Sequence, residues 1–362
     1  MARIGVDLTA CWRPRVGMVT VATELTRAML AASGDGDSYT LFCSRARPPA
    51  LAGVDGAAVL SPHRHEIANK LLWLPPVEAA AGLDAILYPY WPSPPRRRAG
   101  APPAIVFVHD LAFRIRPDEV PWQQRLYLGN LLPPALRGAA AVLVPSEATR
   151  RDLLDCYPLP GLEARVHAVP EGGGLDGVEA SSLPRGLEPG YVLAVGTIEP
   201  RKNYPALLAA HRLLRSRLPV PQLVVAGRVG WAYGDAVRDL RQDPEVRVLG
   251  HVDDACLLAL YRHASVLAFP SLYEGFGLPL LEAMREGVPA LIGDGGSLPE
   301  LAAGCALQVP ATDVVAVADG LERLLSDAAL RADLAERGRR RARDFTWDEA
   351  ARRTLAVVRS VV

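Results

Sequence analysis

Short apolar runs that alternate with helical patterns are the feature of this chain that most restricts its fold. Some runs are apolar at every position, as in Ala104-Ile105-Val106-Phe107-Val108 and Tyr191-Val192-Leu193-Ala194-Val195. Strands that are apolar on both faces are typical of parallel sheets covered by helices on both sides. The pattern therefore predicts doubly wound α/β architecture. The runs that predict strands span 3–8, 39–43, 85–88, 104–109, 140–145, 165–169, 191–196, 222–226, 245–249, 265–269, 289–292 and 305–309.

The length of 362 residues exceeds one ordinary hydrophobic core and predicts two domains. Apolar periodicity disappears after Glu171-Gly172-Gly173-Gly174. We expect a Rossmann-like domain over 1–171, a linker over 172–188 and a second such domain over 189–345. A last helix over 346–362, opened by Thr346 as N-cap, is expected to cross back to the first domain. Because open α/β sheets bind ligands at the carboxyl ends of their strands, we expect a cleft between the domains.

Composition and charge exclude several classes of protein. The formal net charge is zero, which argues against nucleic-acid binding. The basic cluster Arg96-Arg97-Arg98 predicts a solvated loop and only weakly indicates contact with anionic lipid or a phosphorylated partner. Scattered cysteines without C-x-x-C spacing favour neither disulfides nor a zinc site; they are Cys11, Cys43, Cys156, Cys256 and Cys305.

The chain also lacks the marks of a secreted or membrane-spanning protein. No signal-type apolar core stands at the start of the sequence. No apolar stretch reaches the length that spans a bilayer. We therefore expect a cytoplasmic protein, and peripheral contact at the inner membrane face stays an open alternative.

The segment over 265–282 predicts a phosphate site. An apolar strand leads through a glycine-containing loop into a helix, with Pro279 suited to its first position. Free N–H groups and the positive end of the helix dipole make such a junction an anion site. Glu274 and Glu282 stand at the ends of the loop and first turn, and carboxylates bind hydroxyls, which predicts a sugar ligand as well. The alternatives are a solvated loop acid for Glu274 and a dipole-compensating acid for Glu282.

A second segment, Val195-Gly196-Thr197-Ile198-Glu199-Pro200-Arg201-Lys202-Asn203, has the same strand, loop and helix order. Lys70 and Lys202 are the two lysines of a chain that otherwise uses arginine. Since ammonium and guanidinium groups are not interchangeable at a phosphate, Lys202 indicates a required point charge. Arg201 and Lys202 would stabilise the charge on a departing nucleotide diphosphate. The alternative is an exposed basic pair near a helix start.

These two segments give the second half of the chain its resemblance to a known family. Together with Ala226-Gly227-Arg228, Leu249-Gly250-His251-Val252 and Gly296-Ser297-Leu298-Pro299-Glu300, they resemble the C-terminal half of group 1 (family 4) retaining glycosyltransferases, closest to the mannosyltransferase-like branch. The first half is similar more loosely, through His109-Asp110-Leu111 and Val144-Pro145-Ser146. The resemblance implies the GT-B fold, in which two Rossmann-like domains face a cleft.

The resemblance also implies roles for individual residues. Glu274 would bind the donor sugar, Glu282 the ribose, and the backbone near His251 and Val252 would face the nucleobase. The residues implied at the reacting centre are His109, Glu274, Arg201 and Lys202. The further donor-binding residues implied are Gly17, Gly196, Thr197, Gly227, His251, Val252, Gly275, Phe276, Gly277, Leu278 and Glu282.

Positions in the first half are open to a structural interpretation. His109 follows a buried strand, where a histidine is often structural, although the family has one near the donor sugar. Asp110 and Ser146 are each explained by helix capping alone. Relatives carry a glycine-rich turn and a basic residue where this chain has Gly17 and Thr20. That departure puts the class of acceptor in doubt and leaves Arg13 or Arg15 as substitutes for the missing cation.

The function predicted from these residues is transfer of a hexose from a nucleotide diphosphate sugar to an acceptor hydroxyl, with retention. GDP-mannose is the donor that the resemblance favours, with UDP- and dTDP-hexoses close behind. The acceptor is a saccharide, a lipid-linked glycan or a small metabolite. We expect no metal and no other cofactor, since Asp253-Asp254 reads as a helix start rather than a metal site.

Two other functions remain compatible with the sequence. One is a nucleotide-sugar epimerase or a phosphorylase of similar fold. A phosphorylase of the glycogen type needs a cofactor lysine, and Lys70 is far along the chain from any predicted strand end. The other is a non-catalytic nucleotide-sugar-binding subunit, which the altered turn at 15–20 keeps open.

Overall fold

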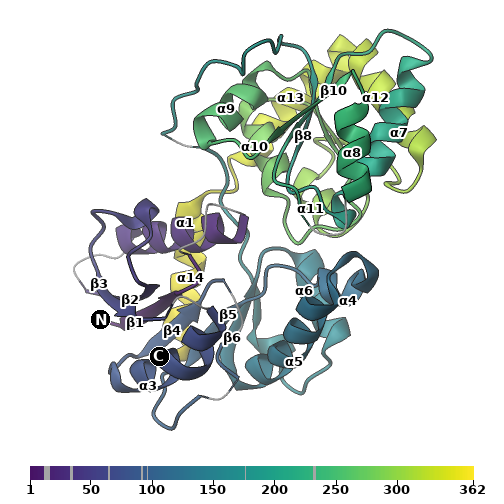
Figure 1. The fold of residues 1–362 in the computed structure, drawn as a ribbon. Coiled ribbons are helices and arrows are strands. Elements are labelled where there is room, and N and C mark those ends of the chain that lie inside the picture. The colour runs from purple at the N-terminus through teal and green to yellow at the C-terminus, as the bar shows by residue number, and fades with distance from the viewer. Residues whose placement is uncertain are drawn as a thin grey trace. The chain divides into compact units, whose positions relative to one another are not determined.

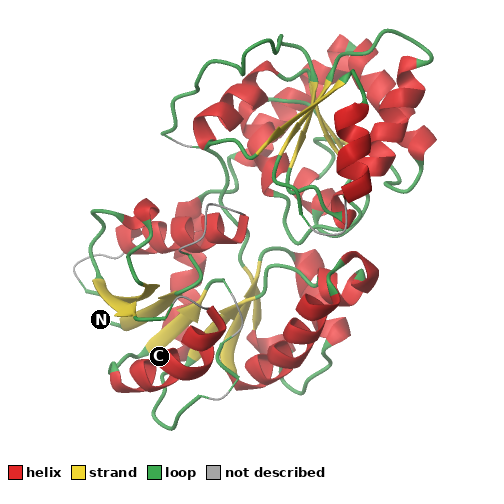
Figure 2. Ribbon diagram, in the orientation of Figure 1, coloured by secondary structure: helices red, strands yellow, loops and turns green. Residues whose placement is uncertain are grey.

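The computed structural model describes residues 1–11, 17–32, 36–63, 66–90, 93–95, 97–175, 177–230 and 234–362. Arg13, Arg15 and Arg96 lie outside the described residues. The chain divides into two compact units, shown as ribbons in Figures 1 and 2. The N-terminal unit comprises Met1–Ile115, Trp122–Gly172 and Phe345–Val362, and the C-terminal unit comprises Arg116–Pro121 and Gly173–Asp344.

The N-terminal unit is built on a parallel sheet whose described strands follow the order β3-β2-β1-β4-β5-β6-β7. The strands are β1 (Arg3–Leu8), β2 (Ser38–Ser44), β3 (Ala57–Ser61), β4 (Ala85–Tyr88), β5 (Ala104–Phe107), β6 (Ala139–Val144) and β7 (Val166–Ala168). The α-helices are α1 (Gly17–Ala32), α2 (Glu66–Ala68), α3 (Leu74–Ala80), α4 (Ala112–Ile115), α5 (Trp122–Gly138), α6 (Glu147–Cys156) and α14 (Trp347–Val361). Short 3₁₀ turns of this unit span Pro49–Leu51 and Glu163–Arg165, and a π-helical turn spans Asn69–Trp73. The 3₁₀ turn Pro117–Glu119 belongs to the C-terminal unit.

Strand β3 is the element of this sheet that the sequence analysis missed. It lies at the edge of the sheet and pairs in parallel with β2. Its residues Ala57 and Ala58 are exposed, and half of Leu60 is exposed. Its apolar run, Ala57-Ala58-Val59-Leu60, is half alanine, a residue that is depleted in strands, so the run is a weak strand signal. Its place in the sheet follows from its pairing with β2.

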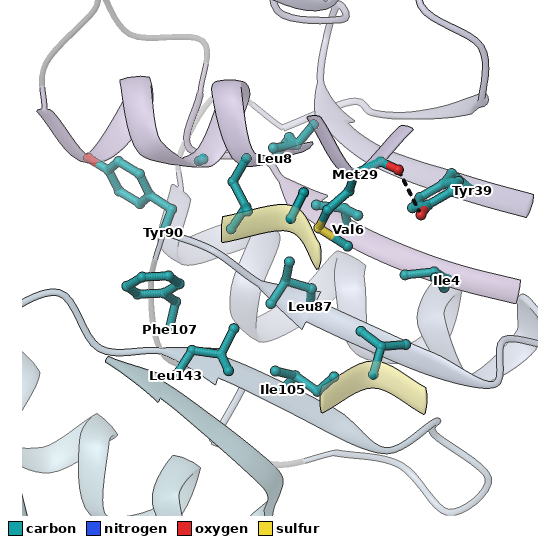
Figure 3. Packing of buried hydrophobic residues seen from close by; sticks show 14 of the residues in the cluster. Ile4, Val6, Leu8, Met29, Tyr39, Leu87, Tyr90, Ile105, Phe107 and Leu143 are labelled. Atoms are coloured by element: carbon teal, nitrogen blue, oxygen red, sulfur yellow. Dashed lines mark hydrogen bonds between the residues drawn. The ribbon is translucent and has the colours of Figure 1, made fainter. Parts of the chain in front are cut away.

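The core of the N-terminal unit lies between the sheet and the helices α1 and α14. Figure 3 shows part of it, including Ile4, Val6 and Met29. Ala351, Leu355 and Val358 from α14 belong to the same buried cluster. Thr346 caps α14 by accepting a hydrogen bond from the N–H of Glu349 (3.1 Å). The last helix therefore returns to the unit that contains the start of the chain, as the sequence analysis expects.

The C-terminal unit is built on a second parallel sheet, with its described strands in the order β10-β9-β8-β11-β12-β13. The strands are β8 (Val192–Val195), β9 (Leu223–Ala226), β10 (Val246–Gly250), β11 (Val266–Phe269), β12 (Ala290–Ile292) and β13 (Leu307–Gln308). The helices are η5, a 3₁₀ turn (Pro200–Lys202), α7 (Tyr204–Arg215), α8 (Gly234–Gln242), α9 (Asp254–His263), α10 (Leu278–Glu286), α11 (Leu298–Ala302), α12 (Val314–Ser326) and α13 (Ala328–Ala342).

The order of strands in the second sheet reverses between β8 and β11. From β8 the chain proceeds outward through β9 to β10, and then returns to add β11 on the other side of β8. In open α/β sheets the loops after such a strand pair separate and leave the crevice where ligands bind. The loops that follow β8 and β11 are the two segments in which the sequence analysis places Arg201, Lys202 and Glu274.

No helix among the described residues is both long and apolar enough to cross a bilayer.

Candidate donor-binding site

The loop after β11 carries a buried carboxylate that is held by two cations. Glu274 is 6% exposed. One of its oxygens, Oε1, lies 2.5 Å from Lys202 Nζ, and the other, Oε2, lies 2.6 Å from Arg201 Nη1. The structure thus brings together three of the four residues that the resemblance implies at the reacting centre.

The loop after β8 and the loop after β11 are joined through their backbones as well as through the cluster of Arg201, Lys202 and Glu274. The N–H of Leu272 donates to the carbonyl of Arg201 at 2.7 Å. Asn203 has a left-handed backbone (φ 59°), which asparagine tolerates better than most residues. Its side-chain amide donates to the carbonyls of Pro270 (3.2 Å) and Ala311 (2.6 Å). Asn203 therefore fixes the end of η5, and with it Arg201 and Lys202, against the loop after β11.

Lys202 is a buried cation that is closely surrounded. Its stem lies beside Gly196, where an added Cβ would come within 3.3 Å of the lysine Cε. Its Nζ lies 4.6 Å from the centre of the Phe269 ring, within range of a cation–π interaction. Burial lowers the pKa of Lys202, and the neighbouring carboxylate of Glu274 opposes this effect. Lys202 is therefore held between the Phe269 ring, the Glu274 carboxylate and the backbone of Gly196.

The charges around Glu274 keep it ionised. Burial by itself would raise the pKa of this carboxyl, but Arg201 and Lys202 outweigh burial and hold the pKa at about 2. Arg201 is anchored in turn by Glu199, whose Oε1 lies 2.6 Å from Arg201 Nε. Two carboxylates and two cations, of which Arg201 is partly exposed, thus lie together at the carboxyl edge of the sheet.

The loop from Glu274 to Gly277 leads directly into helix α10. Gly277 has φ 109°, a backbone conformation that residues with a side chain rarely adopt. The sequence analysis predicts Pro279 as the first residue of this helix. The helix begins at Leu278, so Pro279 is its second residue. Ser297 supports the loop: its N–H donates to the carbonyl of Glu274 (2.9 Å) and its hydroxyl lies 2.8 Å from the carbonyl of Phe276. The N-terminus of α10, a position that favours anions, therefore lies directly after the loop that carries Glu274.

The glycines after β8 and β9 are in close contact. A Cβ added to Gly227 would lie 1.8 Å from the carbonyl oxygen of Gly196. The N–H of Gly227 donates to the carbonyl of Gly250 at 2.8 Å, which links the ends of β9 and β10. Thr197, half-buried, follows Gly196 in the same loop. Any side chain at position 227 would therefore push the end of β9 away from the end of β8.

The remaining predicted donor residues of this unit lie around the same sheet edge. Gly275 and Phe276 are buried within the loop before α10. His251, which is exposed, and Val252 follow β10, two strands away from β8. Glu282 is the fifth residue of α10, beyond its first turn, which removes the interpretation as an acid of that turn.

Glu282 has a protein partner. The hydroxyl of Tyr261 donates to Glu282 Oε2 at 2.8 Å. Burial raises the pKa of Tyr261, and the carboxylate of Glu282 adds to the effect. Tyr261 therefore stays protonated and orients Glu282 as a hydrogen-bond acceptor.

His109 and Gly17 belong to the N-terminal unit. His109 lies just beyond β5, where its Nε2 is 2.7 Å from the carbonyl of Pro89 and its Nδ1 is 3.2 Å from Glu171 Oε1. Gly17 is exposed and is the first residue of α1. Asp110 accepts from the N–H of Ala112 (3.0 Å), and Ser146 caps α6 by accepting from the N–H of Thr149, so capping accounts for both.

Lys70 is closer to a strand end than its sequence position indicates. Its ammonium forms a buried ion pair with Asp7, one residue before the end of β1. Asp7 also accepts hydrogen bonds from the N–H (3.0 Å) and hydroxyl (2.7 Å) of Thr9. The sequence expectation that Lys70 is remote from strand ends is therefore wrong, because residues 63 positions apart meet in the fold. Its ion pair with Asp7 gives Lys70 a structural role.

Four residues of functional interest were not singled out from the sequence: Glu171, Glu199, Asn203 and Ser297. Glu199 and Asn203 flank Arg201 and Lys202 in a segment already recognised, and Ser297 stands in another. Proximity to a strong motif was thus a usable signal for these three. Glu171 stands at the start of a glycine run and carries no such signal.

Among the described residues, no group of three or more His, Cys, Asp or Glu side chains is placed to hold a metal ion. Asp253 caps α9 by accepting from the N–H of Cys256 (2.8 Å), so this acidic pair is a helix start, as the sequence predicts.

Comparison with known proteins gives matches over both halves of the chain. Residues 179–341 match the profile of the glycosyl transferases group 1, and residues 16–176 match that of glycosyltransferase family 4. In fold, the chain is similar to Anabaena HepE, solved in complex with UDP-glucose, with a TM-score of 0.75 and 16% identity over 98% of this chain and 100% of that one.

Two mannosyltransferases are similar in sequence. The O-antigen chain mannosyltransferase B of Escherichia coli is 31% identical over 70% of this chain and 69% of that protein. The MMP alpha-(1->4)-mannosyltransferase of Mycolicibacterium hassiacum is 31% identical over 61% of this chain, and the match spans 54% of that enzyme. The chain has two parallel Rossmann-like sheets, and both halves match family profiles. The chain therefore belongs to the group 1 (family 4) glycosyltransferases of GT-B fold.

Proposed function

We propose that this glycosyltransferase moves a mannosyl group from GDP-mannose to a hydroxyl of a saccharide acceptor, with retention at the anomeric carbon. The observation that carries the proposal is the Glu274 carboxylate, held by Arg201 and Lys202 directly before the N-terminus of α10. A nucleotide diphosphate sugar has the two chemical features that such a site needs, hydroxyls for the carboxylate and a diphosphate for the cations. The two similar mannosyltransferases support mannose as the sugar.

Binding of the donor would require an exchange of partners within the cluster. Arg201 and Lys202 would turn from Glu274 to the diphosphate, while sugar hydroxyls would donate to the freed carboxylate oxygens. The free N–H groups at the start of α10 would add to the binding of the anion. Glu282 would accept from the ribose hydroxyls, in the orientation that Tyr261 gives it.

In the transfer step, the bond between the anomeric carbon and the diphosphate oxygen breaks, and its electron pair leaves with the diphosphate. Arg201, Lys202 and the α10 dipole stabilise the charge that builds there. The acceptor oxygen forms the new bond on the same face of the sugar, and its proton passes to the departing diphosphate. The two cations provide the stabilisation that a metal provides elsewhere, so we propose a reaction without a metal.

The acceptor belongs in our proposal to the saccharides, including those linked to a lipid at the inner membrane face. The name of the E. coli relative, an O-antigen chain mannosyltransferase, supports a growing glycan as acceptor. A lipid-linked acceptor would require only peripheral contact of this cytoplasmic enzyme with the membrane.

Thermal unfolding in the presence of nucleoside diphosphates tests the donor. A ligand that binds only the folded state at about 100 times its Kd stabilises it by about 2.7 kcal/mol. We expect GDP to raise the Tm more than UDP or dTDP at equal concentration. A larger rise with UDP or dTDP would reassign the nucleobase of the donor. No rise with any of the three nucleotides would contradict a donor site in the C-terminal unit.

Steady-state transfer kinetics test the residues. Glu274→Gln, Lys202→Ala and His109→Ala are each expected to lower the transfer rate by about 10²-fold, the usual loss when one preorganised charge-stabilising group is removed. Arg217→Ala, at an exposed ion pair of the C-terminal unit, is the control and should leave the rate unchanged. Excess chelator should also leave the rate unchanged. Near-normal rates in all three variants would show that the site assignment is wrong.

A further inference from the structure

The imidazole of His109 is held on three sides within the N-terminal unit. Its Nε2 lies 2.7 Å from the carbonyl oxygen of Pro89, and its Nδ1 lies 3.2 Å from Glu171 Oε1. The ring stacks on Phe107 with the ring centres 4.5 Å apart and the planes 18° from parallel. The side chains of His109 and Glu171 are 10% and 5% exposed. A ring held in this way has one orientation.

The partners of His109 come from the carboxyl ends of neighbouring strands. Phe107 is the last residue of β5 and part of the core in Figure 3. Pro89 follows directly after β4, and Glu171 stands three residues beyond the end of β7. The N–H of Val169 donates to the carbonyl of Val144 at 2.8 Å, which continues the pairing of β7 with β6 toward Glu171.

The backbone after Glu171 is confined as well. A Cβ added to Gly172 would lie 2.4 Å from the backbone nitrogen of Trp347 at the start of α14. The chain therefore passes against α14 immediately beyond Glu171. Because the backbone at Gly172 is closely packed, the position of the Glu171 side chain is restricted.

The contacts of the two ring nitrogens restrict where protons lie. A carbonyl oxygen can only accept, so Nε2 carries a proton that it donates to Pro89. A bare Nδ1 and an ionised carboxylate are both acceptors and would repel each other. The contact at 3.2 Å is therefore favourable only when a proton lies between Nδ1 and Glu171. Pro89 thus keeps the proton on Nε2, and Glu171 completes the orientation of the ring by its contact with Nδ1.

We propose that Glu171 is a positioning residue for the transfer reaction, which acts through His109. It contacts the imidazole at Nδ1 and holds the ring in the orientation that transfer requires. This inference rests on the role of His109 in the proposed function. Displacement of a reacting group by about 1 Å can cost about 10²-fold in rate, so loss of such a support is expected to be visible in kcat.

A double-mutant cycle tests the proposal on the full chain. Glu171→Ala is expected to lower kcat by about 10- to 100-fold, with little change in the KM for the donor. Added to His109→Ala, the same substitution should cause no further loss, because both changes remove one unit. Glu163→Ala, at an exposed glutamate of the same unit, is the control and should keep the wild-type kcat.

Two further measurements separate positioning from general loss of structure. Glu171→Gln should recover most of the wild-type kcat, because its amide N–H can donate to a bare Nδ1. The ¹⁵N chemical shifts of His109 should show a proton on Nε2 in the wild type and in Glu171→Gln. In Glu171→Ala the shift of Nδ1 should change, because this nitrogen loses its partner, while the Tm stays near that of Glu163→Ala.

The proposal is overturned by any of three results. Additive losses in the double variant would mean that Glu171 acts independently of His109, and a wild-type kcat in Glu171→Ala would mean that it does not act at all. A wild-type kcat in His109→Ala would remove the residue through which Glu171 acts. That last result leaves the proposed function standing if Lys202→Ala is still slow and GDP still raises the Tm, so the two failures are distinguishable.

Discussion

At the scale of single residues, the main feature is that Glu274, Arg201 and Lys202 are each other's partners. The sequence analysis assigns all three to the ligand, the carboxylate to a sugar and the cations to a diphosphate. The structure shows them paired through contacts of 2.5 and 2.6 Å. Because a buried charge without a partner is very unfavourable, residues chosen for a charged ligand must compensate one another before it binds. The pairing is therefore compatible with the ligand roles that we propose.

This pairing predicts an acid-sensitive stability. The pKa of Glu274 is lowered from 4.5 to about 2 in the folded protein. A carboxyl with a depressed pKa stabilises the fold above its unfolded pKa, and that contribution is lost as the pH falls from about 4.5 toward 2. We expect the free energy of unfolding of the C-terminal unit to decrease over this window, measured by denaturant titration at several pH values.

Glu274→Gln is the matched variant for this measurement. It should be less stable at pH 7, because loss of the Glu274 charge leaves the buried Lys202 without its carboxylate partner, while Arg201 keeps Glu199. Its stability should also change less between pH 4.5 and 2. Equal pH slopes for the variant and the wild type would contradict the assignment.

At the scale of elements, the strand ends of the C-terminal sheet are close enough together to exclude side chains. Gly227 shows this most clearly, since its added Cβ would meet the backbone of Gly196 at 1.8 Å. Backbone atoms cannot turn aside as a flexible side chain can. The loops that carry Gly196 and Gly227 must therefore separate if either gains a side chain.

Gly227→Ala is expected to lower the free energy of unfolding by about 1–3 kcal/mol, the usual cost of overpacking, and to weaken nucleotide binding. Gly234→Ala is the control, because an added Cβ there has nothing within 4 Å. It should be neutral or slightly stabilising, since alanine favours helix over glycine. Chemical denaturation and nucleotide titration of both variants measure the difference, and equal stability of the two variants would count against the close contact.

Elements with a strong pattern of their own were predictable from the sequence. The buried strand β5 and helix α14 with its Thr346 cap fall where they were expected. Edge strand β3 was missed because its short, alanine-rich run is a weak strand signal. Its pairing with β2 makes it a strand. Helix α10 begins one residue earlier than Pro279 indicates, since Gly277 provides the turn before it.

At the scale of the whole molecule, the end of the chain completes the unit that contains its beginning. Leu355 of α14 is buried in the same cluster as Leu25 and Met29 of α1. The N-terminal unit therefore lacks part of its core until the last helix has been added. The stability of residues 1–115 should depend on a side chain more than 200 positions away in the sequence.

Leu355→Ala tests this dependence. A buried leucine replaced by alanine costs about 2–5 kcal/mol, and we expect the cost to appear in the N-terminal unit. Hydrogen exchange should accelerate in β1, β4 and β5, and not in β8 and β11. Leu321→Ala, in the core of the C-terminal unit, is the reciprocal control and should show the opposite pattern. Equal acceleration in both units would contradict the division.

The sequence by itself determined the α/β class, most of the strands and the segments that form the candidate donor site. It could do so because apolar periodicity, glycine-containing strand ends and helix starts are local signals, written within a few residues. The tertiary structure decided the partners: Glu274 with Lys202, 72 positions apart, His109 with Glu171, 62 apart, and Asp7 with Lys70, 63 apart. Such pairs depend on which elements of one unit lie side by side, and the pair of Glu274 with Lys202 depends on the reversal between β8 and β11. No local pattern specifies that order, because it is set by the packing of the whole sheet.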